Sequence, residues 1–142
     1  MGQTTPIEGS VFSDSRGKIK TFNTFDMGQI VRFYEIFPDS PEIIRGWQGH
    51  SKEKKWFYCH TGSFAINIIN ISEGNIPVNN RIPEKFVLKE NFPLILEVAK
   101  GSATAFKSLE IGSKLMVFSN FTLEESMNDD IRFPLEKWNT EW

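Results

Sequence analysis

Lys-Lys-Trp-Phe-Tyr-Cys-His at residues 54–60 and Ser-Phe-Ala-Ile-Asn-Ile-Ile-Asn-Ile at residues 63–71 are separated only by Thr61-Gly62. Both runs are rich in aromatic or β-branched residues, which favour extended backbone in a packed sheet. A two-residue turn that contains glycine, placed between two such runs, is typical of a β-hairpin. We therefore predict two strands joined as a hairpin at Thr61-Gly62.

Similar short patterns lie on both sides of this pair, and most are separated by Gly, Pro or Asn. The other predicted strands are residues 18–25, 29–37, 42–47, 84–89, 94–98, 103–109 and 114–121. Helical signal is limited to single turns at 123–127 and 134–138, and residues 73–83 are a predicted loop. Many short strands at a spacing of roughly ten residues indicate one all-β domain over residues 1–142, either a sandwich or a barrel.

The composition argues against several classes of protein. The 142 residues carry a formal charge of −2 with no dense basic cluster, so we expect neither nucleic acid nor a membrane as a partner. A single cysteine excludes an intrachain disulfide and suits a reducing compartment. The first six residues lack the apolar run of a signal peptide, and no apolar stretch approaches the roughly 20 residues of a membrane span. We expect a cytoplasmic protein.

Alternation assigns side chains to the two faces of the predicted strands, because successive residues of a strand point to opposite sides. In residues 29–37, Arg32 and Tyr34 share one face, opposite to Phe33. In residues 54–60, Lys55 and Cys59 share one face. We assign Tyr34 and Cys59 to the lumen of the predicted barrel.

Between those two strands lies Arg45-Gly46-Trp47-Gln48-Gly49-His50, which contains the densest set of candidate site residues. Gln48 and His50 are two positions apart and face the same way. We expect Arg45, His50 and Lys55 to converge at the mouth of the barrel, where two cations and an imidazole suit a phosphorylated ligand. In the competing interpretation the cations are solvated strand ends and His50 is structural.

Five segments together resemble the dTDP-4-dehydrorhamnose 3,5-epimerases and their cupin relatives, which include the dTDP-sugar 3,4-ketoisomerases. The segments are Asp14-Ser15-Arg16-Gly17, Val31-Arg32-Phe33-Tyr34, Arg45-Gly46-Trp47-Gln48-Gly49-His50, Lys55 seven residues before Gly62, and residues 98–106. The resemblance spans residues 14–134. It implies a cupin-type double-stranded jelly-roll barrel, a homodimer, and a nucleotide-sugar site inside the barrel.

The resemblance also implies roles for individual residues. Arg16, Arg45 and Lys55 match the family's positions that hold the diphosphate and the sugar. The catalytic base of the epimerases is a His at the position of Gln48, and the His of a second motif is replaced by Thr104.

The general-acid Tyr of the epimerases should lie near the end of the strand 114–121, where this sequence has Phe118 and Phe121. Epimerisation beside a ketone needs a base on one face of the carbon and an acid on the other. Because neither an amide nor a phenyl ring transfers protons, we do not expect the usual 3,5-epimerase reaction.

The segment at residues 45–50 also resembles an Arg-Gly-x-His-x-His pattern of the ketoisomerases. The second His of that pattern is present here as His50, and the first is absent. An imidazole titrates near neutrality, so His50 is a candidate for moving a proton by itself. Tyr34 is the second catalytic candidate, and Cys59 is a weaker one. The predicted substrate-binding residues are Arg16, Arg32, Arg45, Gln48 and Lys55.

A metal site is not expected, although many cupins hold a metal with several His ligands. The chain has only two histidines, His50 and His60, and the turn and alternation between them keep them apart. Glu53 is the one well-spaced carboxylate, and one His with one carboxylate is a poor ligand set for a transition metal. We expect neither a metal nor a cofactor.

Three functions remain open from the sequence. The first is an epimerase or ketoisomerase that acts on a nucleotide-linked keto sugar in polysaccharide precursor synthesis. The second is a catalytically inactive nucleotide-sugar-binding protein, either a sensor or the partner subunit of an active enzyme. The third is a structural dimer without a ligand of this class. The presence of Arg16, Arg45 and Lys55 favours the first two.

Overall fold

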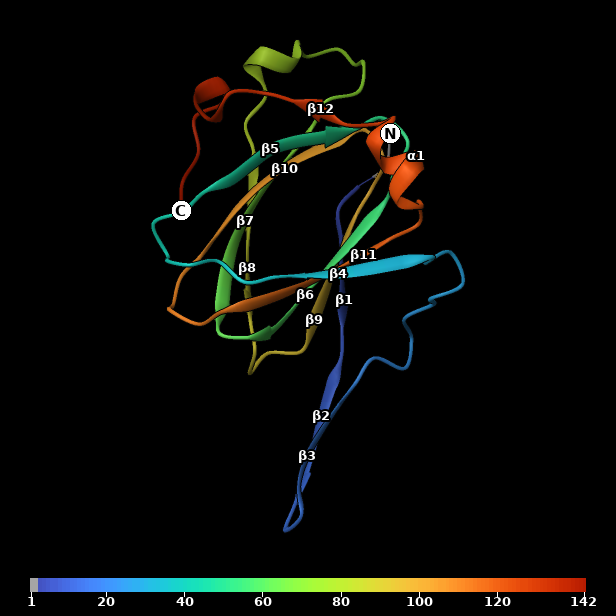
Figure 1. Cartoon of the computed structure of the whole chain (residues 1–142), viewed down its shortest axis with the longest axis vertical. Helices are drawn as coiled ribbons and strands as arrows, with labels where there is room; N and C mark the ends of the chain where they lie inside the picture. Colours follow the sequence, from blue (N-terminus) through green and yellow to red (C-terminus); the bar gives the residue numbers. More distant parts are fainter. Residues whose placement is uncertain (1–2) are drawn as a thin grey trace.

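The structure is a computed structural model that describes residues 3–142, so the first two residues of the predicted domain lie outside the description. Two five-stranded antiparallel sheets face each other (Figure 1). The first sheet has the order β1 (Thr5–Glu8), β9 (Leu94–Val98), β6 (Lys55–Thr61), β11 (Lys114–Ser119) and β4 (Arg32–Ile36). The second has the order β12 (Ile131–Arg132), β5 (Arg45–His50), β10 (Ser102–Ser108), β7 (Ser63–Asn70) and β8 (Glu84–Lys89).

The remaining elements are short. Strands β2 (Ser10–Asp14) and β3 (Gly17–Thr21) pair only with each other, and this hairpin stands away from the two sheets (Figure 1). The helical turns are η1 (Val78–Asn80), α1 (Leu123–Met127) and η2 (Leu135–Lys137). Within residues 3–142, no helix has both the length and the hydropathy needed to cross a membrane.

The main core lies between the two sheets, where alternate residues of the facing strands meet. Phe57 of β6 and Phe64 of β7 both contact Phe106 of β10, with ring centroids 6.0 and 6.4 Å apart. A second cluster lies on the outer face of the second sheet, where Trp47 packs edge-on against Trp138 of the carboxy-terminal segment at 4.9 Å. The second sheet is therefore covered on both faces, which explains why β7 reads as a nearly continuous apolar run.

The predicted hairpin at Thr61-Gly62 is wrong. Strand β6 pairs with β9 and β11, whereas β7 pairs with β10 and β8, so the chain passes from one sheet to the other at Gly62. Gly62 has a φ of +74°, and a Cβ there would lie 2.1 Å from the Ser113 hydroxyl, so the corner requires glycine. A turn that contains glycine, placed between two buried strands, is compatible both with a hairpin and with a corner at which the chain passes from one sheet to the other.

Most other predicted elements are present with shifted ends. The predicted strand 42–47 lies instead at 45–50, and residues 5–8 and 10–14 form strands that the sequence reading missed. The predicted helical turn at 123–127 is confirmed as α1. Thr122 and Glu125 form a reciprocal capping box at its start, which satisfies two backbone N–H groups.

Replacing a fully buried core side chain tests whether packing between the two sheets determines the free energy of unfolding of the domain. Leu96 is 0% exposed, so Leu96→Ala should lower the free energy of unfolding by about 2–5 kcal/mol through lost burial and a residual cavity. Leu123→Ala is the matched control, because that leucine is 61% exposed. Urea unfolding measures both variants. Equal effects of the two changes would contradict this assignment of the core.

Candidate functional site

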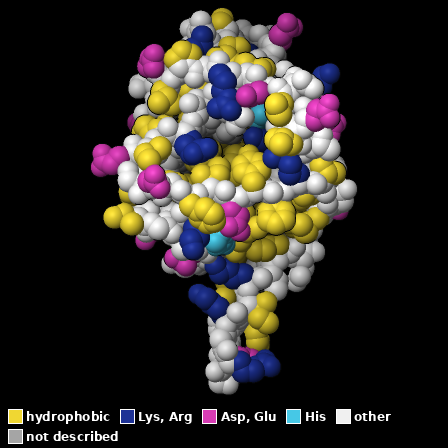
Figure 2. Space-filling view, viewed as in Figure 1, with side chains coloured by type: hydrophobic (Ala, Val, Ile, Leu, Met, Phe, Trp, Pro, Cys, Tyr) yellow, Lys and Arg dark blue, Asp and Glu magenta, His cyan; other side chains and the backbone are white. Residues whose placement is uncertain are grey.

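A hollow opens between the two sheets at the edge formed by β4 of the first sheet and by β5 and β12 of the second. It consists of two adjoining parts of about 220 and 270 Å³, and we call it the barrel cavity. Figure 2 shows a hollow on this face, with hydrophobic side chains at its floor and Lys and Arg side chains around it. Both parts of the cavity share the side chains Tyr34, Gln48, Lys55 and Arg132.

The barrel cavity is rich in cations, and two of them have no carboxylate partner within the described part of the chain. Among residues 3–142, neither Arg45 nor Lys55 forms an ion pair, although Lys55 is only 6% exposed. The Lys55 ammonium lies 5.8 Å from the centre of the Tyr34 ring, and the Arg32 guanidinium lies 5.2 Å from it. These contacts stabilise the cations only in part, so the site favours an anion.

Gly46 brings β5 close enough to β10 to form one wall of this cavity. Its φ is +144°, and a Cβ at this position would lie 2.5 Å from the Ala105 Cβ, so a side chain would push the strands apart. The lumen face of β5 then presents Gln48, whose amide donates to the Asp130 carboxylate at 3.2 Å. Burial raises the pKa of Asp130, but hydrogen bonds from Arg132 and Gln48 outweigh it and lower the pKa.

His50 lies at the other end of β5, with 5% of its surface exposed. Its Nδ1 lies 2.6 Å from the Asp129 carbonyl oxygen, which can only accept, so Nδ1 carries the proton when the ring is neutral. Nε2 then holds a lone pair, and no side chain or backbone group in the described chain bonds to it. Burial, and next the positive charge of Lys55, lower the pKa of His50.

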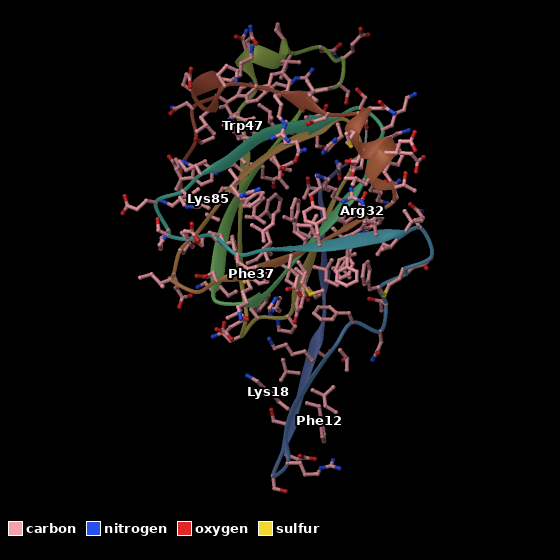
Figure 3. The ribbon with its side chains drawn as sticks, viewed as in Figure 1. Phe12, Lys18, Arg32, Phe37, Trp47 and Lys85 are labelled. Carbon is pink, nitrogen blue, oxygen red and sulfur yellow. The ribbon has the colours of Figure 1, made fainter. Side chains whose placement is uncertain are left out.

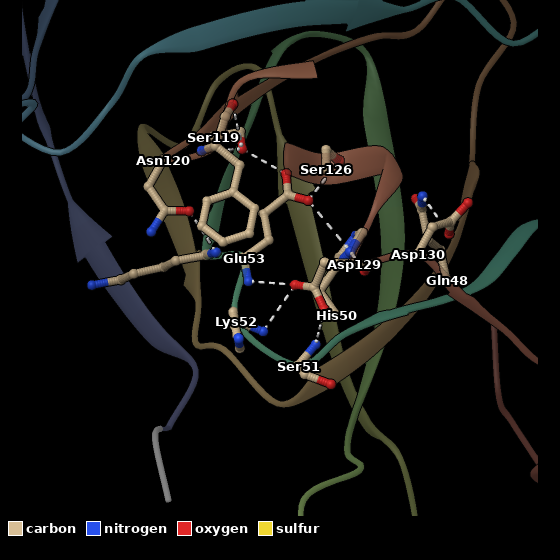
Figure 4. A network of polar contacts seen from close by, with 12 residues as sticks. Gln48, His50, Ser51, Lys52, Glu53, Ser119, Asn120, Ser126, Asp129 and Asp130 are labelled. Carbon is tan, nitrogen blue, oxygen red and sulfur yellow. Dashed lines mark hydrogen bonds and ion pairs between the residues drawn. The ribbon is translucent and has the colours of Figure 1, made fainter. Parts of the chain in front are cut away.

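A buried carboxylate and a backbone clamp hold His50 in place (Figure 4). Glu53, whose side chain is fully buried, lies 3.3 Å from His50 Nδ1 and accepts hydrogen bonds from the Ser119 and Ser126 hydroxyls at 2.5 and 2.6 Å. The Asp129 carboxylate accepts from the backbone N–H groups of residues 51–53 at 2.8–2.9 Å. Burial raises the pKa of Asp129, but these three hydrogen bonds outweigh it, so the pKa is lowered.

The structure brings most of the predicted site residues together. The alternation of side chains along a strand correctly predicted which residues of β4 and β6 face the lumen, since Tyr34 and Lys55 both line the barrel cavity. The predicted residues that line the barrel cavity are Arg32, Tyr34, Arg45, Gln48 and Lys55. His50 faces the same side of β5 as Gln48 but is not among the lining side chains, so its catalytic role stays a prediction.

Cys59 and Arg16 do not join the cavity. Burial raises the pKa of the Cys59 thiol to about 11, so the thiol is an unreactive part of the core. Arg16 lies in the turn between β2 and β3, with its side chain 83% exposed and paired with Asp14 at 2.6 Å. Phe12 and Lys18, labelled on the same hairpin, are far from Arg32 at the cavity (Figure 3).

Three large aromatic residues of the two sheets, Phe118, Trp47 and Trp56, pack against other side chains and do not line the barrel cavity. Phe118 lies on the outer face of β11, with its ring 6.0 Å from Phe33, so it does not occupy a lumen position. Trp47 and Trp56 are both buried, and Trp47 points away from the lumen toward the carboxy-terminal segment (Figure 3). In the described part of the chain, no three His, Cys, Asp or Glu side chains are grouped to hold a metal ion.

The carboxy-terminal segment contributes to the site in a way that was not predicted from the sequence. No role was predicted for residues 129–134. In the structure, Asp129 positions His50, Asp130 bonds Gln48, and Arg132 lines the barrel cavity. The two adjacent acids Asp129 and Asp130 were the available signal, but the spacing of residues in the sequence does not indicate contacts with residues some 80 positions away.

No protein-family model matches this chain, and no curated protein sequence matches it. Solved structures do match. A 3,4-ketoisomerase from Helicobacter canadensis is 20% identical with a TM-score of 0.72, and the match covers 94% of this chain and 93% of the ketoisomerase. The RmlC epimerase of Mycobacterium tuberculosis is 16% identical with a TM-score of 0.81, over 98% of this chain and 74% of the epimerase.

A third match has a sugar nucleotide bound. It is a mutant of the 3,4-ketoisomerase QdtA from Thermoanaerobacterium thermosaccharolyticum in complex with TDP-4-keto-6-deoxyglucose, 21% identical with a TM-score of 0.70 over 92% of this chain and 87% of QdtA. These likenesses confirm the predicted cupin-type jelly roll and its structural similarity to the epimerases and ketoisomerases over nearly the whole chain.

The protonation state of His50 can be tested directly by NMR. Long-range ¹H–¹⁵N spectra at pH 7 should show a protonated Nδ1 and an unprotonated Nε2, and titration should give a pKa below the ordinary 6.5. His50 binds fewer protons in the folded state than in the unfolded state, so its contribution to stability is present above about pH 6.5 and is lost as pH falls below it. His50→Gln identifies the signals. A proton found on Nε2 at pH 7 would contradict the assignment.

Proposed function

We propose that this chain binds a nucleotide-diphosphate keto sugar in the barrel cavity and isomerises its sugar. The supporting observation is that Arg45 and Lys55 face the same cavity without a carboxylate partner among residues 3–142. A buried, unpaired ammonium is costly, and an anionic ligand removes that cost. The bound TDP-4-keto-6-deoxyglucose in the similar QdtA structure supports this class of ligand.

The charge balance of the cavity suits a diphosphate in particular. Among the described residues, four cations line its two parts, namely Arg32, Arg45, Lys55 and Arg132, against one carboxylate, Asp130. Guanidinium groups bind phosphate oxygens through two parallel N–H donors, and a lysine adds a point charge. Gln48, held by Asp130, adds an amide that can bond a sugar hydroxyl.

A shift of the carbonyl between C4 and C3 of the sugar needs only one base. His50 Nε2 removes the proton from C3 while the Tyr34 hydroxyl protonates the C4 oxygen, which gives an enediol. The 3-hydroxyl then returns a proton to Tyr34, and His50 delivers its proton to C4 on the same face. The carbonyl lies at C3, both groups regain their starting protonation states, and no atom is gained or lost.

Epimerisation is the less favoured reaction, because it needs an acid on the opposite face of the carbon. The lumen-facing residues of β11 are Leu115, Val117 and Ser119, and none of these is a general acid. Gln48 and Thr104, at the positions of the family's two His residues, do not transfer protons either. The ketoisomerase also matches this chain over 93% of its own length, against 74% for the epimerase.

One observation favours the alternative, a protein that binds the nucleotide sugar without converting it. His50 is not among the side chains that line the barrel cavity, and its Nε2 atom is buried. The wall near Lys55 is formed in part by Phe57 and Phe106, which have no acid–base chemistry. Against this, Glu53 gives His50 the nearby carboxylate that a proton carrier needs.

Calorimetry with dTDP and dTDP-4-keto-6-deoxyglucose tests both possibilities. Lys55→Met should weaken binding of either ligand by tenfold or more, since it removes a desolvated phosphate contact. Lys54→Met is the matched control, because Lys54 points away from the cavity and pairs with Glu97 at 3.4 Å. Equal binding by the two variants would contradict the proposed ligand site.

The same samples in deuterium oxide separate the enzyme from the binding protein. Entry of deuterium at C3 or C4 of the sugar, abolished by His50→Gln with binding retained, supports the isomerase. Binding without exchange supports the alternative.

We also infer a homodimer that completes the site with Arg16. The β2–β3 hairpin exposes Phe12 and Ile19 at 59% and 58%, and the outer face of β4 exposes Phe33 at 60%, so both surfaces present apolar side chains that a second copy can cover. Such a hairpin can add to a second copy of the chain and carry Arg16 to the partner's barrel cavity. This would account for an arginine that the similar family uses but that lies far from the cavity of its own chain.

Mixing of two variants tests this arrangement. Arg16→Ala and Lys55→Met should each weaken dTDP binding, and the wild-type chain should have the mass of a dimer by light scattering. After subunit exchange, roughly one quarter of the sites should regain normal affinity, because each mixed dimer contains one site with both cations. A monomeric mass, or no recovery on mixing, would show that Arg16 does not act from a partner.

A further inference from the structure

A second cavity, of about 630 Å³, lies outside the barrel between the η1 segment and β12, at the top of Figure 1. It is larger than either part of the barrel cavity. Its apolar floor consists of Ile71, Val78, Ile131 and Phe133. This size and this mostly apolar lining are typical of small-molecule sites.

The charged groups of the second cavity are all positive. Lys100 and Lys137 line it, and none of the described residues in its lining is a carboxylate. Neither lysine forms an ion pair with any of residues 3–142. The hydroxyl of Ser72 is a further polar group in the lining. An apolar floor with two cations matches a molecule that has an apolar body and one anionic end.

Hydrogen bonds hold the outer wall of this cavity in place. The Arg81 guanidinium donates to the carbonyl oxygens of Asn70, Ser72 and Ile76 at 2.7–2.9 Å, which fixes the loop that carries η1. Trp138 donates to the Val78 carbonyl at 3.0 Å and ties that loop to the carboxy-terminal segment. A ligand would therefore enter a preformed space, and little binding energy would be lost in ordering the chain.

The second cavity and the barrel cavity share a wall but no lining side chain. Along β12 and its flanks, Asp130 and Arg132 line the barrel cavity, whereas Ile131 and Phe133 line the second cavity. The alternation of a strand produces this division. Gly49, which pairs with Ile131, has no room for a side chain, because a Cβ would lie 2.8 Å from Ile71. The two cavities thus lie back to back across β5 and β12.

We propose that the second cavity binds an amphipathic carboxylate, with its apolar chain on Ile71, Val78 and Phe133 and its carboxylate between Lys100 and Lys137. The site is separate from the proposed nucleotide-sugar site and does not depend on it. Bound ligand would cover the face of β12 opposite to Arg132.

Calorimetry and NMR with decanoate, below its micelle concentration, test the proposal. Decanoate should bind and shift the signals of Ile71, Ile131 and Phe133, and decanol should bind more weakly. Lys100→Met/Lys137→Met should weaken decanoate binding roughly tenfold, as expected for two partly exposed charge contacts, and should leave decanol binding unchanged. Lys85→Met/Lys107→Met is the matched control, since those lysines line neither cavity.

Two further measurements distinguish this site from the barrel cavity. Val78→Phe should fill the space and abolish binding of both probes, whereas Lys55→Met should change neither. Saturating dTDP should not displace decanoate. Displacement by dTDP, signal changes confined to the exposed face around Phe33, or undiminished binding by the double lysine variant would each overturn the proposal.

Discussion

The carboxylate of Glu53 is the constraint on which much of the site depends. A fully buried carboxylate is tolerated only when hydrogen bonds and opposite charge replace its water. Here the replacements come from four separate elements: Arg32 of β4, His50 of β5, Ser119 of β11 and Ser126 of α1. To satisfy one carboxylate, the chain must bring both sheets and the helix together at the same point.

This arrangement has a consequence for the carboxy-terminal segment. Because the Ser126 hydroxyl donates a hydrogen bond to the Glu53 carboxylate, the chain leaves α1 beside β5. The Asp129 carboxylate can then accept hydrogen bonds from three backbone N–H groups of the turn that precedes β6. The next residues then pair with β5 as β12 and place Arg132 at the barrel cavity. A segment of ordinary loop composition thereby becomes one wall of the site.

The same contacts explain which features could be predicted from the sequence and which could not. Alternation within a strand is local, so it correctly placed Tyr34 and Lys55 in the lumen. Strand pairing is not local: the glycine at residue 62 is as compatible with a corner between sheets as with the predicted hairpin. The approach of Asp129 to His50 joins residues 79 positions apart and leaves no periodic signal. Arg16 was matched to a family motif, yet its hairpin extends away from its own barrel (Figure 1).

Charge links ligand binding to the state of His50. Burial and the positive charge of Lys55 lower the pKa of His50, which favours the neutral imidazole. A diphosphate beside Lys55 would offset that positive charge, so the pKa of His50 would rise toward neutrality as the ligand binds. A base whose pKa lies near the working pH can both take up and return a proton. In the proposed isomerase, Lys55 would thus serve two purposes, since it would attract the anion and the bound anion would raise the pKa of His50.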